Sequence, residues 1–324
     1  MKRFLALTAA AFLAADAWAQ AIPVIFDTDM GNDVDDALAL AMLHALESRG
    51  ECRLLGVTVT KDNPWAAVYV DLVNTFYGRA QIPVGMVKGS GVTPENSKMI
   101  QAPAERRRVD GTLVYPRRLA SGAEAVEAVA LLRRLPAAAR DGTVVIVQVG
   151  FSTNLARLLD APADVDLVKR KVKLLSVMAG NFVEPKPEFN VEKDTASARK
   201  LFDRWPEEIV ASGYEIGDAM KFPAARIEKD FVWAPDHPVV DAYRAYMKMP
   251  YDRQTWDLTA VLYAVRPGGG YFELSAPGRI TADDAGRTSF RAEAAGKHRY
   301  LVLPESLRAR TLECMVGLAS QPRQ

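Results

Sequence analysis

The chain has 324 residues, and its charges nearly cancel, with 41 Lys and Arg residues against 40 Asp and Glu residues. Because acidic and basic residues are interspersed, the sequence lacks the positive patch that a nucleic acid or an anionic membrane would attract. Only two cysteines are present, Cys52 and Cys314, which excludes a disulfide-stapled small domain and a cysteine zinc site. We therefore expect no nucleic-acid partner and no membrane partner.

The first 19 residues are expected to be a secretory signal peptide. They start with two basic residues, continue with an apolar run over residues 4–15 and end in Ala-Trp-Ala at Ala19. No later stretch is long and apolar enough to span a bilayer, so we expect the mature protein in the periplasm or outside the cell. About 305 residues remain after cleavage, enough for residues 20–324 to form one large α/β domain.

Strand-like and helix-like runs alternate over most of the chain, which is typical of a parallel sheet with helices on both faces. We expect strands at residues 24–26, 53–60, 82–87, 143–149, 173–178 and 208–212. We expect helices at residues 37–46, 64–77, 123–135, 155–159, 194–202, 239–247, 254–265 and 304–318. The sequence therefore predicts an open, mostly parallel, Rossmann-like α/β sheet.

Two regions depart from this alternation. Residues 267–303 contain several short strand-like segments, which predict a small antiparallel β element near the C-terminus. Residues 88–121 are polar and interrupted by prolines, with no predicted element. Loops of this length in a compact domain are usually functional or disordered, so this segment is a candidate cover for an active site.

The strongest chemical signal is a group of five aspartates between the first strand and the first helix, in the sequence IPVIFDTDMGNDVDDALAL that starts at Ile22. These residues are Asp27, Asp29, Asp33, Asp35 and Asp36. Their carboxylates repel one another, and a hard divalent cation is the simplest way to hold them together. Alternatively, Asp33 or Asp35 caps the following helix. Capping does not explain Asp27 and Asp29, which directly continue a buried strand, so we expect a metal or catalytic site.

Further polar residues follow the later strands in the same way. They are Asn63, Thr153, Asn154, Asn181, Glu188, Asn190 and, at the start of a helix, Asp257. Because open α/β sheets bind ligands beyond the carboxyl ends of their strands, we expect these side chains to converge on one rim of the sheet.

Four separated motifs resemble the nucleoside hydrolases, the inosine-uridine-preferring family and its relatives. The family signature DxDxGxDD after the first strand appears here as DTDMGNDVDD, with two additional residues. The other three are Thr153-Asn154, Glu188-Phe189-Asn190 and Trp256-Asp257. The resemblance covers residues 22–265. It implies the nucleoside hydrolase fold and hydrolysis of the N-glycosidic bond of ribonucleosides to ribose and a free base, with purine nucleosides slightly favoured.

The resemblance also implies a calcium site. Its ligands would be Asp29, Asp36, the backbone carbonyl of Thr153 and Asp257, an all-oxygen set of the kind that calcium prefers. Asp27 would orient one of these ligands. Asp33 lies in the additional residues, and its role stays open among a further ligand, a helix cap and the role given to Asp35.

Other family residues would bind the sugar and carry the chemistry. Asp35 and Asn63 would hydrogen-bond the ribose hydroxyls, and Asn181, Glu188 and Asn190 would bind its other edge. Calcium would activate a water, and Asp29 would be the general base that directs it to C1′. Carboxylates would stabilise the positive charge that develops on the ribose ring. Asn63 also fits as the cap of the helix that follows it.

Trp256 is the clearest departure from the inosine-uridine-preferring members, which have a histidine there as candidate acid for the leaving base. A tryptophan at this position is similar to the purine-specific members, in which stacking on the base is thought to help it leave. Packing in the core is an equally good explanation of Trp256.

Two other functions compete with nucleoside hydrolysis as explanations of this sequence. The missing histidine and the altered aspartate spacing are compatible with a calcium-dependent nucleoside or sugar binding protein without turnover. A haloacid-dehalogenase-type phosphatase, with Asp27 as nucleophile and magnesium as cofactor, leaves Gly31 and the later motifs unexplained. The expected partner is therefore a small nucleoside, and a homodimer or homotetramer is a possible assembly.

Overall fold

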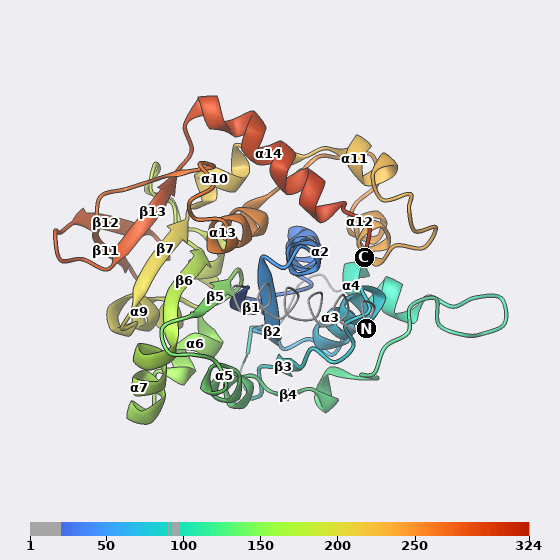
Figure 1. Ribbon diagram of the computed structural model, residues 1–324, viewed down its shortest axis with the longest axis horizontal. Helices are drawn as coiled ribbons and strands as arrows, with labels where there is room; N and C mark the ends of the chain where they lie inside the picture. Colours follow the sequence, from blue (N-terminus) through green and yellow to red (C-terminus); the bar gives the residue numbers. More distant parts are fainter. Residues whose placement is uncertain (1–20, 90, 93–97, 324) are drawn as a thin grey trace, which may run out of the picture.

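The computed structural model describes residues 21–89, 91–92 and 98–323 (Figure 1). The expected signal peptide, residues 1–19, lies outside the described residues. Among the described helices, none combines the length and the apolar character needed to cross a membrane.

An eleven-stranded sheet forms the centre of the described chain. Seven strands lie side by side in the order β4, β3, β2, β1, β5, β6, β7, and every neighbouring pair is parallel. Their bounds are Ile22–Thr28 (β1), Cys52–Val59 (β2), Val84–Met86 (β3), Val126–Glu127 (β4), Val144–Gln148 (β5), Val172–Met178 (β6) and Glu208–Ser212 (β7). The predicted open, mostly parallel sheet is confirmed.

The C-terminal strands extend this same sheet. Strand β13 (His298–Val302) pairs parallel with β7, and β11 (Gly278–Ala282) and β12 (Thr288–Ala292) add an antiparallel edge. Strand β10 (Glu273–Leu274) pairs antiparallel with β13. The expected small β element is therefore present and is hydrogen-bonded to the parallel strands.

Helices cover both faces of the sheet (Figure 1). One face carries α2 (Asp35–Ser48), α3 (Ala66–Phe76), α12 (Pro238–Tyr246), α13 (Trp256–Val265) and α14 (Glu305–Ala319), and the other carries α5 (Ala128–Ala137), α6 (Thr153–Leu158), α7 (Pro162–Lys171) and α9 (Thr195–Arg204). Alternate residues of a strand enter separate cores, as Val24 and Phe26 pack with α2 whereas Ile25 packs with α6. Strands buried on both faces explain the continuous apolar runs in the sequence.

The structure corrects one predicted helix and adds others. Residues 123–135 were expected to be one helix, but Gly122–Glu124 form a 3-10 turn, Val126–Glu127 form β4, and α5 begins at Ala128. Glu127 fixes that start because its carboxylate accepts hydrogen bonds from Val129 N at 2.9 Å and Ala130 N at 2.7 Å. Unpredicted elements include α7, α4 (Lys98–Glu105), α8 (Phe189–Lys193), α10 (Tyr214–Asp218), α11 (Ala224–Lys229) and the ribbon of β8 (Lys221–Phe222) with β9 (Arg253–Gln254).

Candidate active site

The strand order reverses at β1, which has β2 on one side and β5 on the other. Loops leave the carboxyl ends of β1 and β5 in opposite directions, and such switch points form the ligand crevices of open α/β sheets. A cavity of about 390 Å³ lies here. Its acidic lining residues are Asp29, Asp33, Asp35, Asp36, Glu188 and Asp257. The predicted rim of polar residues therefore exists, although not every predicted residue reaches it.

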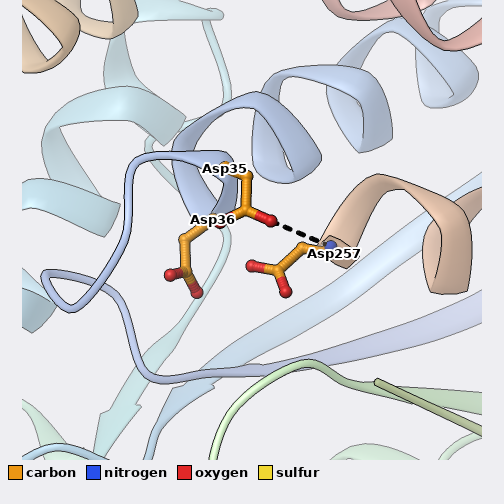
Figure 2. A group of neighbouring side chains, drawn as sticks. All are labelled: Asp35, Asp36 and Asp257. Carbon is orange, nitrogen blue, oxygen red and sulfur yellow. Dashed lines mark hydrogen bonds between the residues drawn. The ribbon is translucent and has the colours of Figure 1, made fainter. Parts of the chain in front are cut away.

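Three carboxylates form a compact group in this cavity. Figure 2 shows Asp35 and Asp36 in the first turn of α2 and Asp257 in the first turn of α13. Each offers one oxygen, and these oxygens lie within 4.8 Å of one another. The backbone N–H of Asp257 donates to Asp35 Oδ2 at 3.1 Å and so joins the two helix ends. Negative charge is favoured at helix N-termini, which makes the junction of α2 and α13 a suitable place for the group.

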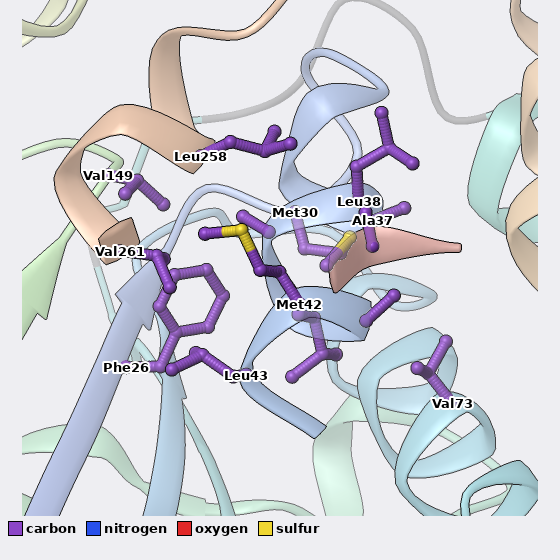
Figure 3. Packing of buried hydrophobic residues seen from close by; sticks show 14 of the residues in the cluster. Phe26, Met30, Ala37, Leu38, Met42, Leu43, Val73, Val149, Leu258 and Val261 are labelled. Atoms are coloured by element: carbon purple, nitrogen blue, oxygen red, sulfur yellow. The ribbon is translucent and has the colours of Figure 1, made fainter. Parts of the chain in front are cut away.

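Apolar packing fixes the two helices that carry these carboxylates. Figure 3 shows Met42 and Leu43 of α2 packed with Phe26 of β1 and with Leu258 and Val261 of α13. Helix α2 is buried from Asp35 to Glu47, so it is a core helix rather than a surface one. Each fully buried large apolar side chain contributes about 1.5–3 kcal/mol to the stability of the folded state. The three carboxylates are therefore attached to two tightly packed helices.

Because these three carboxylates are buried close together, their charged forms are unfavourable without a balancing positive charge. The pKa values of Asp35, Asp36 and Asp257 are raised well above the usual range, first by burial and then by the neighbouring aspartates. At neutral pH these groups must either take up protons or be balanced by a cation. All of their donor atoms are oxygens, which suits a hard divalent cation.

Asp29 and Asp27 are also buried, and each has an oxygen without a hydrogen-bond donor. Burial raises the pKa of Asp29 to about 6, against the opposing charge of Lys61, and burial raises that of Asp27 to about 7. Oδ2 of both residues accepts no hydrogen bond from the described chain. Gly150 permits the loop after β5 to approach this point, because a Cβ there would lie 2.4 Å from Asp29 N. The orphaned buried oxygen of Asp29, in one cavity with three further carboxylates, fits a bound cation.

The proposed calcium ligands are only partly brought together. Asp36 and Asp257 belong to the compact group, and Asp29 lines the same cavity outside it. Asp35, which the resemblance assigns to the sugar, is the third member of the group. Thr153 does not line the cavity, and its hydroxyl donates to Asp194. Asp27 lies behind the cavity, where Asn154 Nδ2 donates to its Oδ1 at 2.9 Å.

Apart from Asp35, the predicted sugar-binding residues divide into two pairs. Glu188 and Asn190 line the cavity. Glu188 accepts from Gly180 N and Asn190 N at 3.0 Å each, and burial raises its pKa to about 7. Asn190 Nδ2 donates to the carbonyls of Val149 at 3.0 Å and Met178 at 3.2 Å. Both side chains are thereby held at the ends of β5 and β6.

Asn63 and Asn181 are buried but do not line the cavity. Asn63 Oδ1 accepts from Trp65 N at 2.8 Å, just before α3. Asn181 Oδ1 accepts from Val183 N at 3.2 Å and from Glu184 N at 2.8 Å. In this structure, both amides hold the backbone of their own loops.

Asp33, which the sequence left without a role, forms an ion pair with Arg253, and both residues line the cavity. Its carboxylate receives Nε of Arg253 at 2.9 Å and also Nη2 of the same residue. Its Oδ1 also accepts from Val34 N at 2.6 Å, while α2 has no side-chain cap. Capping of α2 by Asp33 or Asp35 is therefore not observed. The neighbouring Asn32 accepts a hydrogen bond from the buried Lys61 Nζ at 2.7 Å. Basic side chains therefore hold two of the three residues between Gly31 and Asp35.

Aromatic side chains also line the cavity. They are Phe189, Tyr214, Tyr246 and Trp256. The rings of Tyr214 and Trp256 have centroids 5.4 Å apart, and Trp256 Nε1 donates to the carbonyl of Tyr214 at 2.9 Å. Trp256 is thus at the cavity wall as well as packed against the core.

Sequence reasoning missed several residues of the cavity and its surroundings. Tyr214, Tyr246 and Arg253 come from α10, the end of α12 and the short strand β9. Elements α10 and β9 were not predicted at all, so nothing in the sequence indicated where their side chains lie. For Arg253, the one available signal was its position three residues before Trp256.

The described part of residues 88–121 lines no part of the cavity. Helix α4 packs against α12 and α3 instead. Its Ile100 reaches the loop between β1 and α2, where a Cβ on Gly31 would lie 2.5 Å from Ile100 Cδ1. Gly31 also has φ +108°, a conformation that favours glycine. The segment therefore supports the aspartate loop from outside.

Comparisons with known proteins agree with this geometry. Residues 24–311 match the family model described as inosine-uridine preferring nucleoside hydrolase. No protein in a search of curated sequences matches the chain.

Solved structures show the same fold. A plant nucleoside hydrolase is 21% identical with a TM-score of 0.68, and the match covers 93% of this chain and 99% of that one. An inosine-uridine preferring nucleoside hydrolase from Bacillus anthracis is 17% identical with a TM-score of 0.67, covering 92% and 99%. A purine-preferring ribonucleoside hydrolase from Gardnerella vaginalis is 18% identical with a TM-score of 0.68, covering 92% and 98%.

The family match spans nearly the whole chain, and the carboxylate-lined cavity lies where the shared signature falls. The chain therefore belongs to the inosine-uridine preferring nucleoside hydrolase family, whose members are hydrolases that act on N-glycosyl bonds.

Proposed function

We propose that this protein hydrolyses ribonucleosides to ribose and a free base with calcium as cofactor, slightly favouring purine nucleosides. The group of Asp35, Asp36 and Asp257 carries the proposal, because it lies in one cavity with Asp29 and with an aromatic wall. We further infer from the N-terminal 19 residues that the protein acts in the periplasm or outside the cell. A homodimer or homotetramer stays a prediction from the family.

The cation would be held by Asp36 and Asp257, together with Asp29 and the carbonyl of Thr153. The donor set supports calcium over zinc, because the cavity wall formed by the described residues has carboxylates and no histidine or cysteine. When bound, calcium supplies positive charge that offsets the buried carboxylates and Lewis acidity that makes water a better nucleophile.

Asp29 would act as general base on the attacking water. Its Oδ2 is buried and has no hydrogen-bond donor in the described chain, so this oxygen can take a proton. With a pKa of about 6, Asp29 is mostly ionised at neutral pH. As the C1′–N bond breaks, the carboxylates around the sugar stabilise the positive charge that develops on the ribose ring.

The remaining residues would position the nucleoside. Asp35, Glu188 and Asn190 border the cavity and would bind the ribose hydroxyls. Asn63 and Asn181 stay predictions from the family, since their side chains bond their own loops. Trp256 would stack on the base, and the neighbouring rings of Tyr214 and Tyr246 support the slight preference for purines.

Release of reducing sugar from a panel of purine and pyrimidine nucleosides tests this function. We expect the parent protein to release ribose and an Asp29→Asn variant to release far less. A matched control is Asp203→Asn, which removes an exposed carboxylate paired with Arg279. Binding of nucleosides without ribose release would instead identify a binding protein.

A further inference from the structure

The proposed reaction has no assigned group that donates a hydrogen bond or a proton to the leaving base. When the C1′–N bond breaks, its electron pair stays on a nitrogen of the base, which then carries negative charge. Trp256 stands where the resemblance would place a histidine, and an indole N–H that is bonded to the carbonyl of Tyr214 cannot supply a proton. A hydrogen-bond donor to the departing base must therefore come from another residue.

Among the described residues that line the cavity, Arg253 is the one with a positive charge. The centre of its guanidinium lies 5.3 Å from the ring centroids of both Tyr246 and Trp256. A base bound among these aromatic rings would therefore lie near this positive charge. The aromatic residues and Arg253 line the same cavity as the carboxylate group.

Asp33 fixes the orientation of this guanidinium. Its two carboxylate oxygens receive Nε and Nη2, a bidentate geometry that defines the plane of the group. Nη1 donates to no residue of the described chain, so it keeps its hydrogen-bonding capacity for a ligand. Burial lowers the pKa of Arg253, but the hydrogen bond and charge of Asp33 outweigh it and raise the pKa. The group is therefore always charged.

We propose that Arg253 stabilises the leaving base by donating a hydrogen bond from Nη1 to an acceptor on it, with Asp33 as the positioning residue. This inference rests on the proposed function. The oxygen of water forms the new bond to C1′, its proton passes to Asp29, and the electron pair of the broken bond stays on the base. Arg253 keeps its own proton, and the released base takes one from solvent.

The same geometry favours bases with an oxo group at the edge that meets Arg253. A guanidinium only donates, so it pairs with the O6 and N7 acceptors of a 6-oxopurine. At the same edge, adenine offers N7 and an amino group, which is a second donor. Arg253 should therefore help inosine more than adenosine.

A purely structural role is the competing explanation, because the Asp33 to Arg253 pair also joins the aspartate loop to β9. The two roles can be separated by measuring how the activity of the variants depends on the leaving group of the substrate. Inosine needs stabilisation of its base, whereas p-nitrophenyl β-D-ribofuranoside releases a stable phenolate that needs little help. A variant that is partly unfolded loses activity on both substrates equally, so the ratio of the two activities reports the leaving-group role alone.

The experiment compares kcat/KM for inosine and the nitrophenyl riboside in Arg253→Gln, Arg253→Lys and Asp33→Asn. We expect the inosine to nitrophenyl ratio to fall about 100-fold in R253Q, the low end of the loss when an electrostatic donor is removed from an active site. R253K keeps the charge and should recover part of the ratio. D33N should lower the ratio less than R253Q.

Arg266→Gln is the matched control. Arg266 forms a bidentate pair with Glu51 at the opposite end of α13, and its side chain is 21% exposed, as is that of Arg253. The inosine to nitrophenyl ratio of the Arg266→Gln variant should stay at the parent value. An R253Q ratio within threefold of the parent would overturn the inference. A parent protein that hydrolyses neither substrate would overturn the proposed function instead.

Discussion

The two sides of the cavity are built in different ways. The carboxylate group stands on the first turns of α2 and α13, two buried helices that pack against the central strands. On the aromatic side, Tyr214 lies on α10 and Arg253 on β9, which are short elements, and Tyr246 is the last residue of α12. This difference indicates that the residues proposed to hold the cation and the sugar are rigidly placed, whereas those proposed to meet the base can vary without disturbing the sheet.

The largest expected effect comes from the rigid side. Asp257→Asn should lower kcat/KM for inosine by about 1,000-fold, because it removes charge from the centre of the carboxylate group. Ribose release measures this, with Asp203→Asn as the control. Activity within tenfold of the parent would show that Asp257 does not hold the cofactor.

On the aromatic side, Trp256→Ala should have a smaller effect that depends on the base. Stacking on one base contributes about 1–3 kcal/mol, so kcat/KM for inosine should fall about 5- to 150-fold. Uridine offers a smaller ring and should lose less. Trp256→Phe keeps a ring and should retain most of the activity. Equal losses on inosine and uridine would favour core packing as the role of Trp256.

The buried carboxylates also predict how stability depends on pH without a cation. Burial raises the pKa of Asp27 and Glu188 to about 7 and that of Asp29 to about 6, above the values of about 4 in the unfolded chain. The folded state therefore holds protons that the unfolded state has lost, and this stability disappears as the pH rises from about 4 through 7.

We accordingly expect the Tm of chelator-treated protein to be higher at pH 5.5 than at pH 8, by about 5 °C or more. Calcium should raise the Tm at pH 8 and reduce the difference. Melting curves at both pH values, with and without calcium, measure this. A Tm that is higher at pH 8 in chelator would contradict the electrostatic description of the site.

The smallest expected effect concerns the turn that leads from β1 to α2. Gly31→Ala places a Cβ where φ is +108° and where Ile100 Cδ1 lies 2.5 Å away. Left-handed backbone costs about 1–2 kcal/mol for a residue with a Cβ, so the Tm should fall by about 2–8 °C. Adding Ile100→Ala removes the clash but not the backbone cost. A Gly31→Ala protein as stable as the parent would show that this turn adapts.

Sequence patterns predicted the rigid side because its signals are local. Five aspartates at the end of an apolar strand are visible without a structure, and the helix that follows is strongly apolar. The alternation of strands and helices also predicted the sheet. Strand β4 was missed because it has two residues, and α7 because it buries only Asp164 and Val168 and so has little apolar periodicity.

The partners of a side chain could not be predicted from its type. An asparagine after a strand can bind a sugar or hold a loop, and the structure shows the loop contacts of Asn63 and Asn181. The pairing of Asp33 with Arg253 joins residues 220 positions apart, which only the folded chain brings together. Residues of the aromatic side likewise meet only through the fold.

Calcium binding and activity measured on the same sample test the central claim most directly. Chelator-treated protein is titrated with calcium while bound calcium and ribose release from inosine are both followed. The proposed function predicts no ribose release without calcium, and recovery that follows the binding of calcium to the parent but not to Asp257→Asn. Full ribose release in excess chelator, or calcium binding that restores no activity, would contradict it.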